Sequence, residues 1–477
     1  MNDPLSLLPF ALAAGNGSIN AVPVQQAVAA GVTLLQRCAP VVRALAGKRA
    51  GILLPPGHAF LTALTAAEGR GTVLFNPLAS APEIAHQIED AGIGAIFTLE
   101  LLARHLPADG PLVVLLDDAP DEARVRDGSI TRIVDLSTHA PFRLEGEQDV
   151  DGRDEEAVVV YTSAMAGVPL GAILTHQNLL HNARATLAGA GFTADDHVLA
   201  LLPWAHLFGL VVTGAAPLLA GASVVTQDRF VPSRVLDAIE QDGITALVGV
   251  PSMFDAILTA LENRAHTTPL GTLRLCICGG APLSPELQER WAHATGVELR
   301  QGYGLTEGGP VCLFNHVTIP NARGTLGVPM IGVEVMVADP ATGKPAATGD
   351  EGELWVRGPN VSPGYVSGDA DGLGRQDGWL RTGDLAFLRA DGRFVFSGLS
   401  KPMFTRNGFN IYPREIERAV MELDGVDGVR ATGIPSPREN DIRLEVEGSV
   451  TEDEVRAWCR KRLSAYKQPS TVEVTSR

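Results

Sequence analysis

Hydrophobic and polar positions follow two patterns along the chain. Over roughly the first two thirds, short apolar runs rich in β-branched residues alternate with stretches whose apolar residues recur at helical spacing. This alternation is typical of βα units that form mainly parallel sheets. It predicts strands over 50–55, 71–75, 94–99, 158–163, 197–203, 244–250, 273–278 and 297–303.

The loops that follow these strands are the first candidates for a binding site. After 273–278 comes GGAPLSPELQERW, in which Ser284 can cap a helix and Pro285 suits the first helical turn. Because ligands of open α/β sheets gather outside the carboxyl ends of the strands, we expect these loops to share one crevice.

The pattern changes from about Arg323 onward. Short strands separated by turns follow, which is typical of antiparallel β structure and of a small barrel. After Leu399, helices are expected over 413–423 and 451–466, with a strand over 443–448. The predicted fold class is α/β: a large N-terminal domain of mainly parallel sheets flanked by helices, with a small antiparallel β-barrel, and a small α+β C-terminal domain.

Composition and charge narrow the function classes. The chain has 477 residues, too many for one small domain, and its 45% hydrophobic and 19% charged residues are ordinary for a globular α/β enzyme. The net charge of −17 argues against nucleic acid as a partner, because binding to phosphate backbones needs clustered cations.

Cysteine usage and apolar windows indicate the compartment. The five cysteines lack ligand-like spacing, and Cys276 and Cys278 alternate within one predicted strand, so both are expected to be buried. The N-terminus has no secretory pattern. The most apolar window, 209–225, is too short and too interrupted to span a bilayer. We therefore expect a cytoplasmic protein without a transmembrane segment.

Three loops carry side chains able to bind a ligand. In QGYGLTEGGP, Thr306 can donate to a phosphoryl or carboxylate oxygen and Glu307 can hold Mg²⁺; the alternative is a glycine-rich turn with a solvated glutamate. In GWLRTGDLAF, Asp384 can accept hydrogen bonds from ribose hydroxyls or only occupy a turn. In LPWAHLFG, His206 follows a predicted strand, where a lone histidine is more often a loop residue than a catalyst.

The order of the motifs carries more information than each motif alone. Between residues 161 and 417 follow YTSAMAGVPLGAIL, LPWAHLFG, CGGAPL, QGYGLTEGGP, GELWVRGPNVSPGY, GWLRTGDLA and GFNIYPREIE. Together with the upstream LFNPLASAPEIAHQIEDAGIGAIFT, they resemble the AMP-forming adenylating superfamily of acyl-CoA synthetases, luciferases and peptide-synthetase adenylation domains. The resemblance covers nearly the whole chain, and GFNIYPREIE is most similar to fatty-acyl-CoA ligases.

The resemblance implies a domain plan and a reaction. The plan is an AMP-binding domain over 1–397 with a β-rich subdomain over about 323–397, a hinge over 398–402 and a shortened C-terminal lid over 403–477. Such enzymes join a carboxylate to the α-phosphate of ATP with release of pyrophosphate, the lid then rotates, and coenzyme A attacks the acyl-adenylate. ATP, Mg²⁺, coenzyme A and a fatty or aromatic acid are therefore expected; the motifs settle neither the acid nor the oligomeric state.

The resemblance also implies roles for individual residues. Thr306 would contact the α-phosphate, Glu307 would hold Mg²⁺, and His206 would guard the passage of the acyl and pantetheine chains. Lys401 would lie in the hinge and Gly408 beside the pantetheine tunnel. The residues expected around ATP or AMP are Thr162, Ser163, Gly167, Gly279, Gly280, Ala281, Gly302, Tyr303, Gly304 and Asp384.

The chain departs from the family pattern where that pattern binds phosphate. The family loop usually reads TSGTTGxPKG; here 164–166 reads AMA and Leu170 replaces the lysine, so two hydroxyls and one cation are lost. In the hinge, Leu399 replaces an arginine and Pro402 an acidic residue. The GK motif expected after LSAYKQPSTVEVTSR is missing, which leaves Lys401 or Lys467 as spatial substitutes for its lysine.

Two hypotheses follow. In the first, the protein is an acid–thiol ligase whose adenylation step is impaired or altered. In the second, it is a non-catalytic acyl- or nucleotide-binding paralogue with a sensing or partner-binding role. The retained Glu307 favours the ligase, because a pure acyl binder has no need of Mg²⁺.

Overall fold

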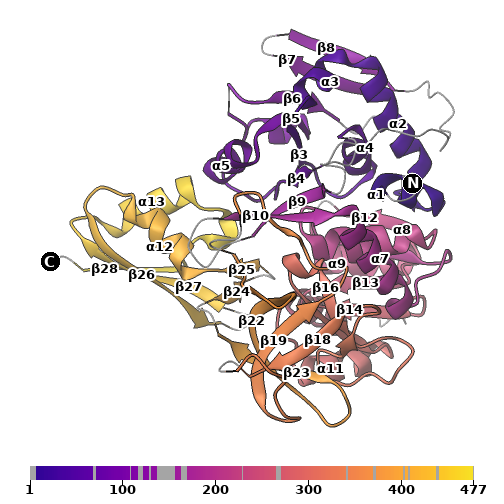
Figure 1. Cartoon of the computed structure of the whole chain (residues 1–477), viewed down its shortest axis with the longest axis vertical. Coiled ribbons are helices and arrows are strands. Elements are labelled where there is room, and N and C mark those ends of the chain that lie inside the picture. The colour runs from indigo at the N-terminus through magenta and orange to yellow at the C-terminus, as the bar shows by residue number, and fades with distance from the viewer. Residues whose placement is uncertain are drawn as a thin grey trace.

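Over the residues that it describes, the computed structural model places five sheets and their covering helices around one central region (Figure 1). The C-terminal segment, defined here as residues 403–475 and drawn in yellow, lies against both the indigo N-terminal part and the orange β-rich part. The residues that the structure describes are 7–67, 71–107, 109–116, 122–127, 130–136, 156–162, 169–227, 229–264, 270–339, 342–368, 372–400, 403–406, 409–436 and 440–475.

The first sheet contains the predicted early strands. Its centre is parallel, and the antiparallel pairs lie towards its two edges. Across the described residues the strand order is β20 (Gly364–Tyr365), β10 (Leu170–Thr175), β9 (Glu156–Thr162), β4 (Thr72–Leu74), β3 (Arg49–Leu53), β5 (Ile93–Thr98), β6 (Leu112–Leu115), β7 (Glu122–Asp127) and β8 (Ile130–Asp135).

The second sheet contains the later predicted strands. It is parallel from β12 through β15, and β16 then pairs antiparallel with β15. Within the described ranges its order is β17 (Val328–Pro329), β16 (Val311–Phe314), β15 (Leu299–Gly304), β14 (Leu275–Cys278), β13 (Ala246–Gly249), β11 (His197–Ala200), β12 (Ser223–Thr226), β1 (Ser18–Ile19) and β2 (Val22–Pro23).

Helices cover these two sheets, and their ends follow the local sequence. Ser284 caps α11 by accepting a hydrogen bond from the Leu287 N–H, and Pro285 is the first helical residue, as predicted. The helices of this part are α1 (Leu8–Ala14), α2 (Val24–Arg37), α3 (Ala39–Leu45), α4 (His58–Ala66), α5 (Ala81–Ala91), α6 (Glu100–Ala103), α7 (His176–Ala190), α9 (Pro232–Gln241), α10 (Pro251–Glu262) and α11 (Pro285–Thr295).

The apolar window 209–225 forms a buried helix and then a strand. A π-helix, η2 (Phe208–Ala215), continues into α8 (Ala216–Leu219), and β12 follows. Thr213 is fully buried but satisfied, because its hydroxyl donates to the Gly209 carbonyl and accepts from the Trp204 indole. No single described helix has the length and apolar composition of a membrane span; α2 and α3 reach that threshold only as a pair bent by 90°.

The remaining strands confirm the predicted change to antiparallel structure. In the part that the structure describes, the third sheet has the order β18 (Glu334–Ala338), β19 (Glu351–Arg357), β22 (Trp379–Leu388) and β21 (Arg375–Gln376), and β23 (Phe394–Leu399) also pairs with β22. β23 thus includes Gly398 and Leu399, the first two residues of the expected hinge. The mixed α/β fold class is confirmed.

The C-terminal segment is a compact α+β unit, as predicted. Its helix α13 ends at Arg462, earlier than the predicted 466, because Leu463 adopts an extended conformation. Its described elements are β24 (Phe404–Arg406), β25 (Phe409–Ile411), α12 (Pro413–Met421), β26 (Val426–Pro435), β27 (Asn440–Gly448), α13 (Glu452–Arg462), the 3₁₀ turn η4 (Ala465–Lys467) and β28 (Thr471–Thr475).

The hydrophobic core confirms the interpretation of the cysteines. Cys276 and Cys278 lie on β14 and are both fully buried, so they act as small apolar side chains. The C-terminal segment has a core of its own around Ile416, Leu444 and Cys459. This cluster is separate from the clusters of the rest of the described chain.

Candidate active site

A cavity of about 420 Å³ lies where the two mainly parallel sheets, the antiparallel sheet and the C-terminal segment meet. Every predicted site residue that falls within the described ranges borders it: Thr162, His206, Gly279, Gly280, Ala281, Gly302, Tyr303, Gly304, Thr306, Glu307 and Asp384. The predicted Ser163, Gly167, Lys401 and Gly408 lie outside the described residues. The expected shared crevice therefore exists, and the roles of its residues remain predictions.

Glu307 is held in place by a tyrosine that sequence reasoning did not single out. It lies in the 3₁₀ turn η3 (Thr306–Gly308) after β15 and is 7% exposed. The Tyr365 hydroxyl donates to Glu307 Oε1 over 2.7 Å and accepts from the Leu373 N–H. Burial raises the pKa of Tyr365, so its phenol stays protonated and remains a donor. GELWVRGPNVSPGY contains this tyrosine, but its sequence gave no sign of the partner.

The Asp384 carboxylate is also held in place by a tyrosine hydroxyl. It lies on β22, and the Tyr303 hydroxyl donates to its Oδ2 over 2.6 Å. Burial and the Asp384 charge both raise the pKa of Tyr303, so this phenol also stays protonated. Tyr303 was expected as part of the nucleotide wall; in the structure it also fixes the orientation of the carboxylate expected at the ribose.

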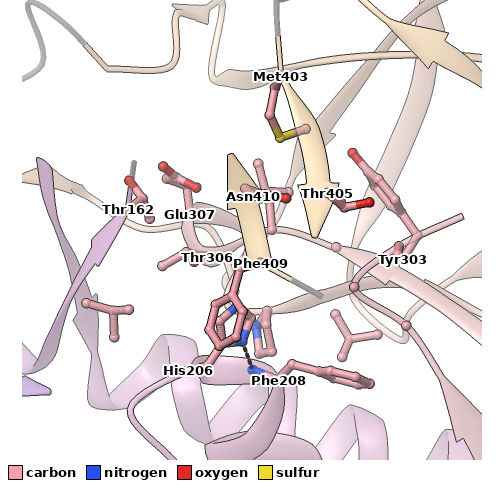
Figure 2. Close-up of a pocket in the computed structure, with 18 of the residues that line it drawn as sticks. Thr162, His206, Phe208, Tyr303, Thr306, Glu307, Met403, Thr405, Phe409 and Asn410 are labelled. Atoms are coloured by element: carbon pink, nitrogen blue, oxygen red, sulfur yellow. Dashed lines mark hydrogen bonds between the residues drawn. The ribbon is translucent and has the colours of Figure 1, made fainter. Parts of the chain in front are cut away.

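His206 borders the cavity in its neutral form. Burial lowers the pKa of its imidazole. Nδ1 accepts a hydrogen bond from the Phe208 N–H, which leaves the proton on Nε2 (Figure 2). Phe409, from the hairpin β24–β25, borders the same cavity (Figure 2). His206 can therefore donate a hydrogen bond at neutral pH but carries no charge there.

Glycines bring the backbone close to the cavity at two loops. A Cβ on Gly304 would lie 1.7 Å from the Pro310 carbonyl oxygen, so no larger residue fits at the end of β15. Gly280, in the loop after β14, has a φ of +78°, which side chains other than glycine rarely adopt. Both glycines border the cavity, at the ends of the neighbouring strands β14 and β15.

The C-terminal segment completes the cavity. Thr405, Phe409 and Asn410 border it from the hairpin β24–β25, and Met403 from the position just before β24 (Figure 2). Lys467 also borders it, but its ammonium group is bound by two carboxylates, Glu83 and Glu415. These partners come from α5 and α12, and no motif in the sequence indicated them.

Two of the departures from the family pattern are visible. Leu399, at the end of β23, borders the cavity. Leu170 is on β10, is buried, and also borders the cavity. The AMA stretch at 164–166 and Pro402 lie outside the described residues.

The side chains that border the cavity suit a metal ion that takes most of its ligands from a bound substrate. In the described ranges, no group of three or more histidine, cysteine, aspartate or glutamate residues forms a protein-only metal site. Glu307 borders the cavity and carries one carboxylate. Mg²⁺ commonly takes one or two carboxylates together with substrate phosphates and water, so Glu307 fits such an ion.

Comparisons with known proteins agree with this architecture. The AMP-binding enzyme family model matches residues 36–366. A feruloyl-CoA synthase from Amycolatopsis is 34% identical over 441 residues, which are 90% of this chain and 85% of the relative. A long-chain-fatty-acid–CoA ligase from Salmonella typhimurium is 30% identical over 462 residues, which are 90% and 82% of the two chains.

A solved structure matches the whole chain. It is a malonyl-CoA ligase in a ternary product complex with methylmalonyl-CoA and AMP, with a TM-score of 0.78 and 27% identity over 100% of this chain and 99% of that one. The chain belongs to the AMP-binding enzyme family, the family of the acyl-CoA synthetases and ligases.

Proposed function

We propose that the protein is an acid–thiol ligase that activates a carboxylic acid with ATP and transfers the acyl group to coenzyme A. The observation that carries the proposal is the single cavity: it joins the Thr306–Glu307 turn and Asp384 to the hairpin that carries Phe409. A nucleotide subsite and a passage for a thiol thereby share one space. The family match and the CoA ligases among the relatives support the same reaction.

In the proposed adenylation step, a carboxylate oxygen of the acid bonds to the α-phosphorus of ATP, and the bond from that phosphorus to the β-phosphate oxygen breaks. The Thr306 hydroxyl would donate to an α-phosphoryl oxygen, and Asp384, oriented by Tyr303, would accept from the ribose hydroxyls. Bound Mg²⁺ would supply positive charge beside the phosphates, and Glu307 would hold it. Donors that are fixed before the reaction stabilise the developing charge without reorganisation.

In the proposed thioester step, the sulfur of coenzyme A bonds to the acyl carbonyl carbon. The bond from that carbon to the AMP oxygen breaks, AMP leaves, and the thiol proton is released. His206 is neutral with its proton on Nε2, so it would donate a hydrogen bond in the passage without attracting anions there. The hairpin β24–β25 would exclude water from the acyl-adenylate, which otherwise hydrolyses.

We further propose that the acid is apolar, either aromatic or fatty. Apolar side chains such as Val212, Ile277 and Phe314 border the cavity. The relatives include both a feruloyl-CoA synthase and a long-chain-fatty-acid–CoA ligase, at 34% and 30% identity. Ferulate, benzoate and palmitate are therefore the first acids to test.

Adenylation is proposed to be the slower of the two steps. Leu399 places an apolar side chain at the cavity where the family pattern has an arginine. Lys467, which also borders the cavity, is paired with Glu83 and Glu415, so its ammonium group is already bound. The same two observations favour the second candidate function, an acyl- or nucleotide-binding protein without turnover.

One experiment separates the two candidates. The purified protein is incubated with Mg²⁺, ATP, coenzyme A and each acid, and pyrophosphate and acyl-CoA are measured. We expect both products with at least one acid, and a loss of at least about tenfold in Glu307→Gln, which removes one charge. Unchanged pyrophosphate release in that variant removes the Mg²⁺ role of Glu307. Binding of the acids without either product supports the binding protein.

A further inference from the structure

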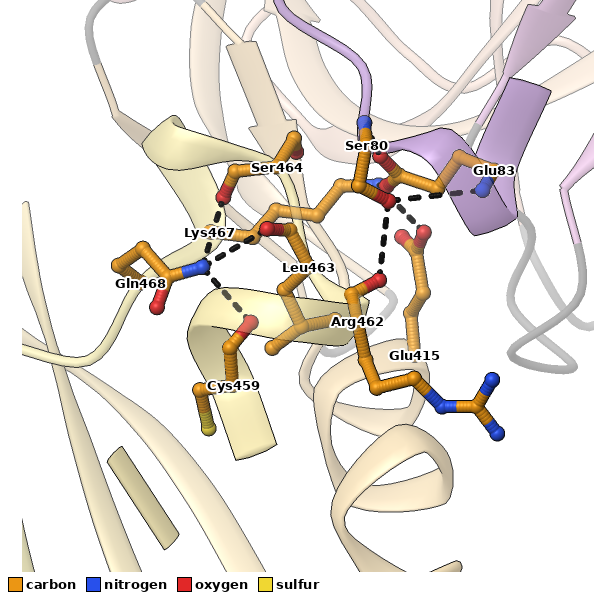
Figure 3. A network of polar contacts seen from close by, with 9 residues as sticks. All are labelled: Ser80, Glu83, Glu415, Cys459, Arg462, Leu463, Ser464, Lys467 and Gln468. Atoms are coloured by element: carbon orange, nitrogen blue, oxygen red, sulfur yellow. Dashed lines mark hydrogen bonds and ion pairs between the residues drawn. The ribbon is translucent and has the colours of Figure 1, made fainter. Parts of the chain in front are cut away.

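A buried polar junction joins α5 of the N-terminal part to the end of α13 (Figure 3). Ser80 caps α5 together with Glu83: the Ser80 hydroxyl accepts from the Glu83 N–H, and Glu83 Oε2 accepts from the Ser80 N–H over 2.6 Å. The same Ser80 hydroxyl donates to the Arg462 carbonyl over 3.0 Å. The cap of one helix thus binds the C-terminal end of another, where opposite ends of the two helix dipoles meet.

Lys467 is the centre of this junction. Its side chain is only 4% exposed, and its Nζ donates to Glu83 Oε1 over 2.7 Å and to Glu415 Oε1. Burial alone would lower the pKa of Lys467, but the carboxylates of Glu415 and Glu83 outweigh burial and raise it, so the ammonium stays charged. The bond to Glu415 lies within the C-terminal segment, whereas the bond to Glu83 crosses to the N-terminal part.

The bonds of Lys467 to Glu415 and to Glu83 therefore depend differently on the orientation of the C-terminal segment. A buried ion pair adds little net stability, because desolvation of the charges offsets their attraction. The bond between Lys467 and Glu83 nevertheless depends on orientation, since it exists only while the C-terminal segment rests on α5. If the segment turns away, Glu83 returns to solvent and Lys467 keeps Glu415.

A continuous set of contacts connects the junction to the cavity. Tyr466 precedes Lys467 in η4, and its ring stacks on Phe409 with centroids 4.3 Å apart and planes 19° apart. Arg406, on the same hairpin as Phe409, donates to the Tyr466 and Gln468 carbonyls. Phe409 and His206 both border the cavity. The position of Lys467 therefore sets the position of the hairpin over the cavity.

We propose that Lys467 and Glu83 are positioning residues for thioester formation, forming a latch that holds the hairpin β24–β25 over the acyl-adenylate. The proposal rests on the proposed function and on the rotation of the lid between the two steps, which the resemblance to the adenylating superfamily implies. In the step that the latch serves, the coenzyme A sulfur bonds to the acyl carbon, the bond to the AMP oxygen breaks, and the thiol proton is released. The latch touches none of these atoms.

The sharpest variant is Glu83→Gln. Glutamine can still accept from the Ser80 N–H, so the cap of α5 is kept, and the pair of Lys467 with Glu415 is untouched. The variant removes the carboxylate charge and the bond from Lys467, because the amide NH2 that takes the place of Oε1 cannot accept. Glu89→Gln is the matched control, because Glu89 lies exposed on the same helix.

Each half-reaction is measured separately, on the full chain. Thioester formation is followed as consumption of a synthetic acyl-adenylate with coenzyme A, and adenylation as acid-dependent exchange of pyrophosphate into ATP. For Glu83→Gln we expect thioester formation to fall at least about tenfold, as for the loss of one charge-assisted bond, and adenylation to change less than about threefold. Glu89→Gln should match the wild type in both.

Hydrogen exchange of the hairpin supplies a readout that does not need turnover. Amides of 404–406 and 409–411 should exchange faster in Glu83→Gln than in the wild type or in Glu89→Gln. Equal losses in both half-reactions, or unchanged exchange of the hairpin, overturn the latch. If the wild type catalyses neither half-reaction, the proposed function fails, while hydrogen exchange alone still decides whether Glu83 holds the hairpin.

Discussion

Replacing Tyr365 by phenylalanine removes one hydroxyl from the buried side of Glu307. That hydroxyl donates to Glu307 Oε1 over 2.7 Å and accepts from the Leu373 N–H over 3.2 Å. The ring itself packs in the core, is 8% exposed, and has the same shape in phenylalanine. The change therefore tests the hydrogen bonds without creating a cavity.

The expected size follows from these contacts. A hydrogen bond to a carboxylate contributes about 1.5–3 kcal/mol, and a neutral one about 0.5–1.5 kcal/mol. Because Glu307 borders the cavity, water can replace part of the lost bond, so we expect a loss of unfolding free energy of about 1–3 kcal/mol. Glu307 would also lose its fixed orientation, and we expect the adenylation rate to fall about tenfold or more.

The assay is pyrophosphate exchange into ATP for Tyr365→Phe, Glu307→Gln and the double variant. If Tyr365 acts through Glu307, the double variant is no slower than Glu307→Gln alone, since the two changes remove one function. Tyr412→Phe is the control, because Tyr412 borders the same cavity without a described hydrogen bond to Glu307. Fully additive losses in the double variant would refute the reasoning.

Three further outcomes are expected. Tyr303→Phe frees Asp384 from its donor, so the KM for ATP should rise about tenfold while kcat changes less, measured by steady-state kinetics. Burial raises the pKa of Cys312 to about 12 and of Cys459 to about 11, so a thiol reagent at pH 8 should label neither in the folded protein and both after denaturation. Burial lowers the pKa of His206, so on acidification the unfolded chain binds a proton at this histidine before the folded chain does. Below about pH 6.5, the unfolding free energy should therefore fall more steeply in the wild type than in His206→Gln, by up to about 1.4 kcal/mol per pH unit.

Each of these three predictions has a result that would contradict it. A KM for ATP that stays unchanged in Tyr303→Phe removes Asp384 from the nucleotide subsite. Rapid labelling of either cysteine at pH 8 contradicts their burial. Urea unfolding curves that shift equally with pH in the wild type and His206→Gln show that the histidine titrates normally in the folded protein.

Local sequence signals predicted the elements well because their causes are local. Runs of β-branched residues predicted the buried strands, and Ser284 with Pro285 predicted the start of α11. The alternation of Cys276 and Cys278 gave the strand β14. The end of α13 was placed too late, because the helical pattern continues past Leu463 while the backbone there is already extended.

The supports of the site were not predictable because their partners lie far apart in the chain. Tyr365 and Glu307 are 58 positions apart, and Lys467 and Glu83 are 384 apart. The sequence indicated Lys467 only as a candidate for contacting the nucleotide. In the structure, the Lys467 ammonium group is bound by Glu83 and Glu415. No local sequence pattern shows whether a lysine contacts a ligand or two carboxylates of its own chain.

The most direct test of the central claim is a single reaction mixture of wild-type protein, Mg²⁺, ATP, coenzyme A and ferulate or palmitate, analysed by mass spectrometry. The proposed ligase forms AMP, pyrophosphate and acyl-CoA in equal amounts, and forms none of them when the acid is omitted. Absence of acyl-CoA with every aromatic and fatty acid, together with binding of those acids, would contradict the claim.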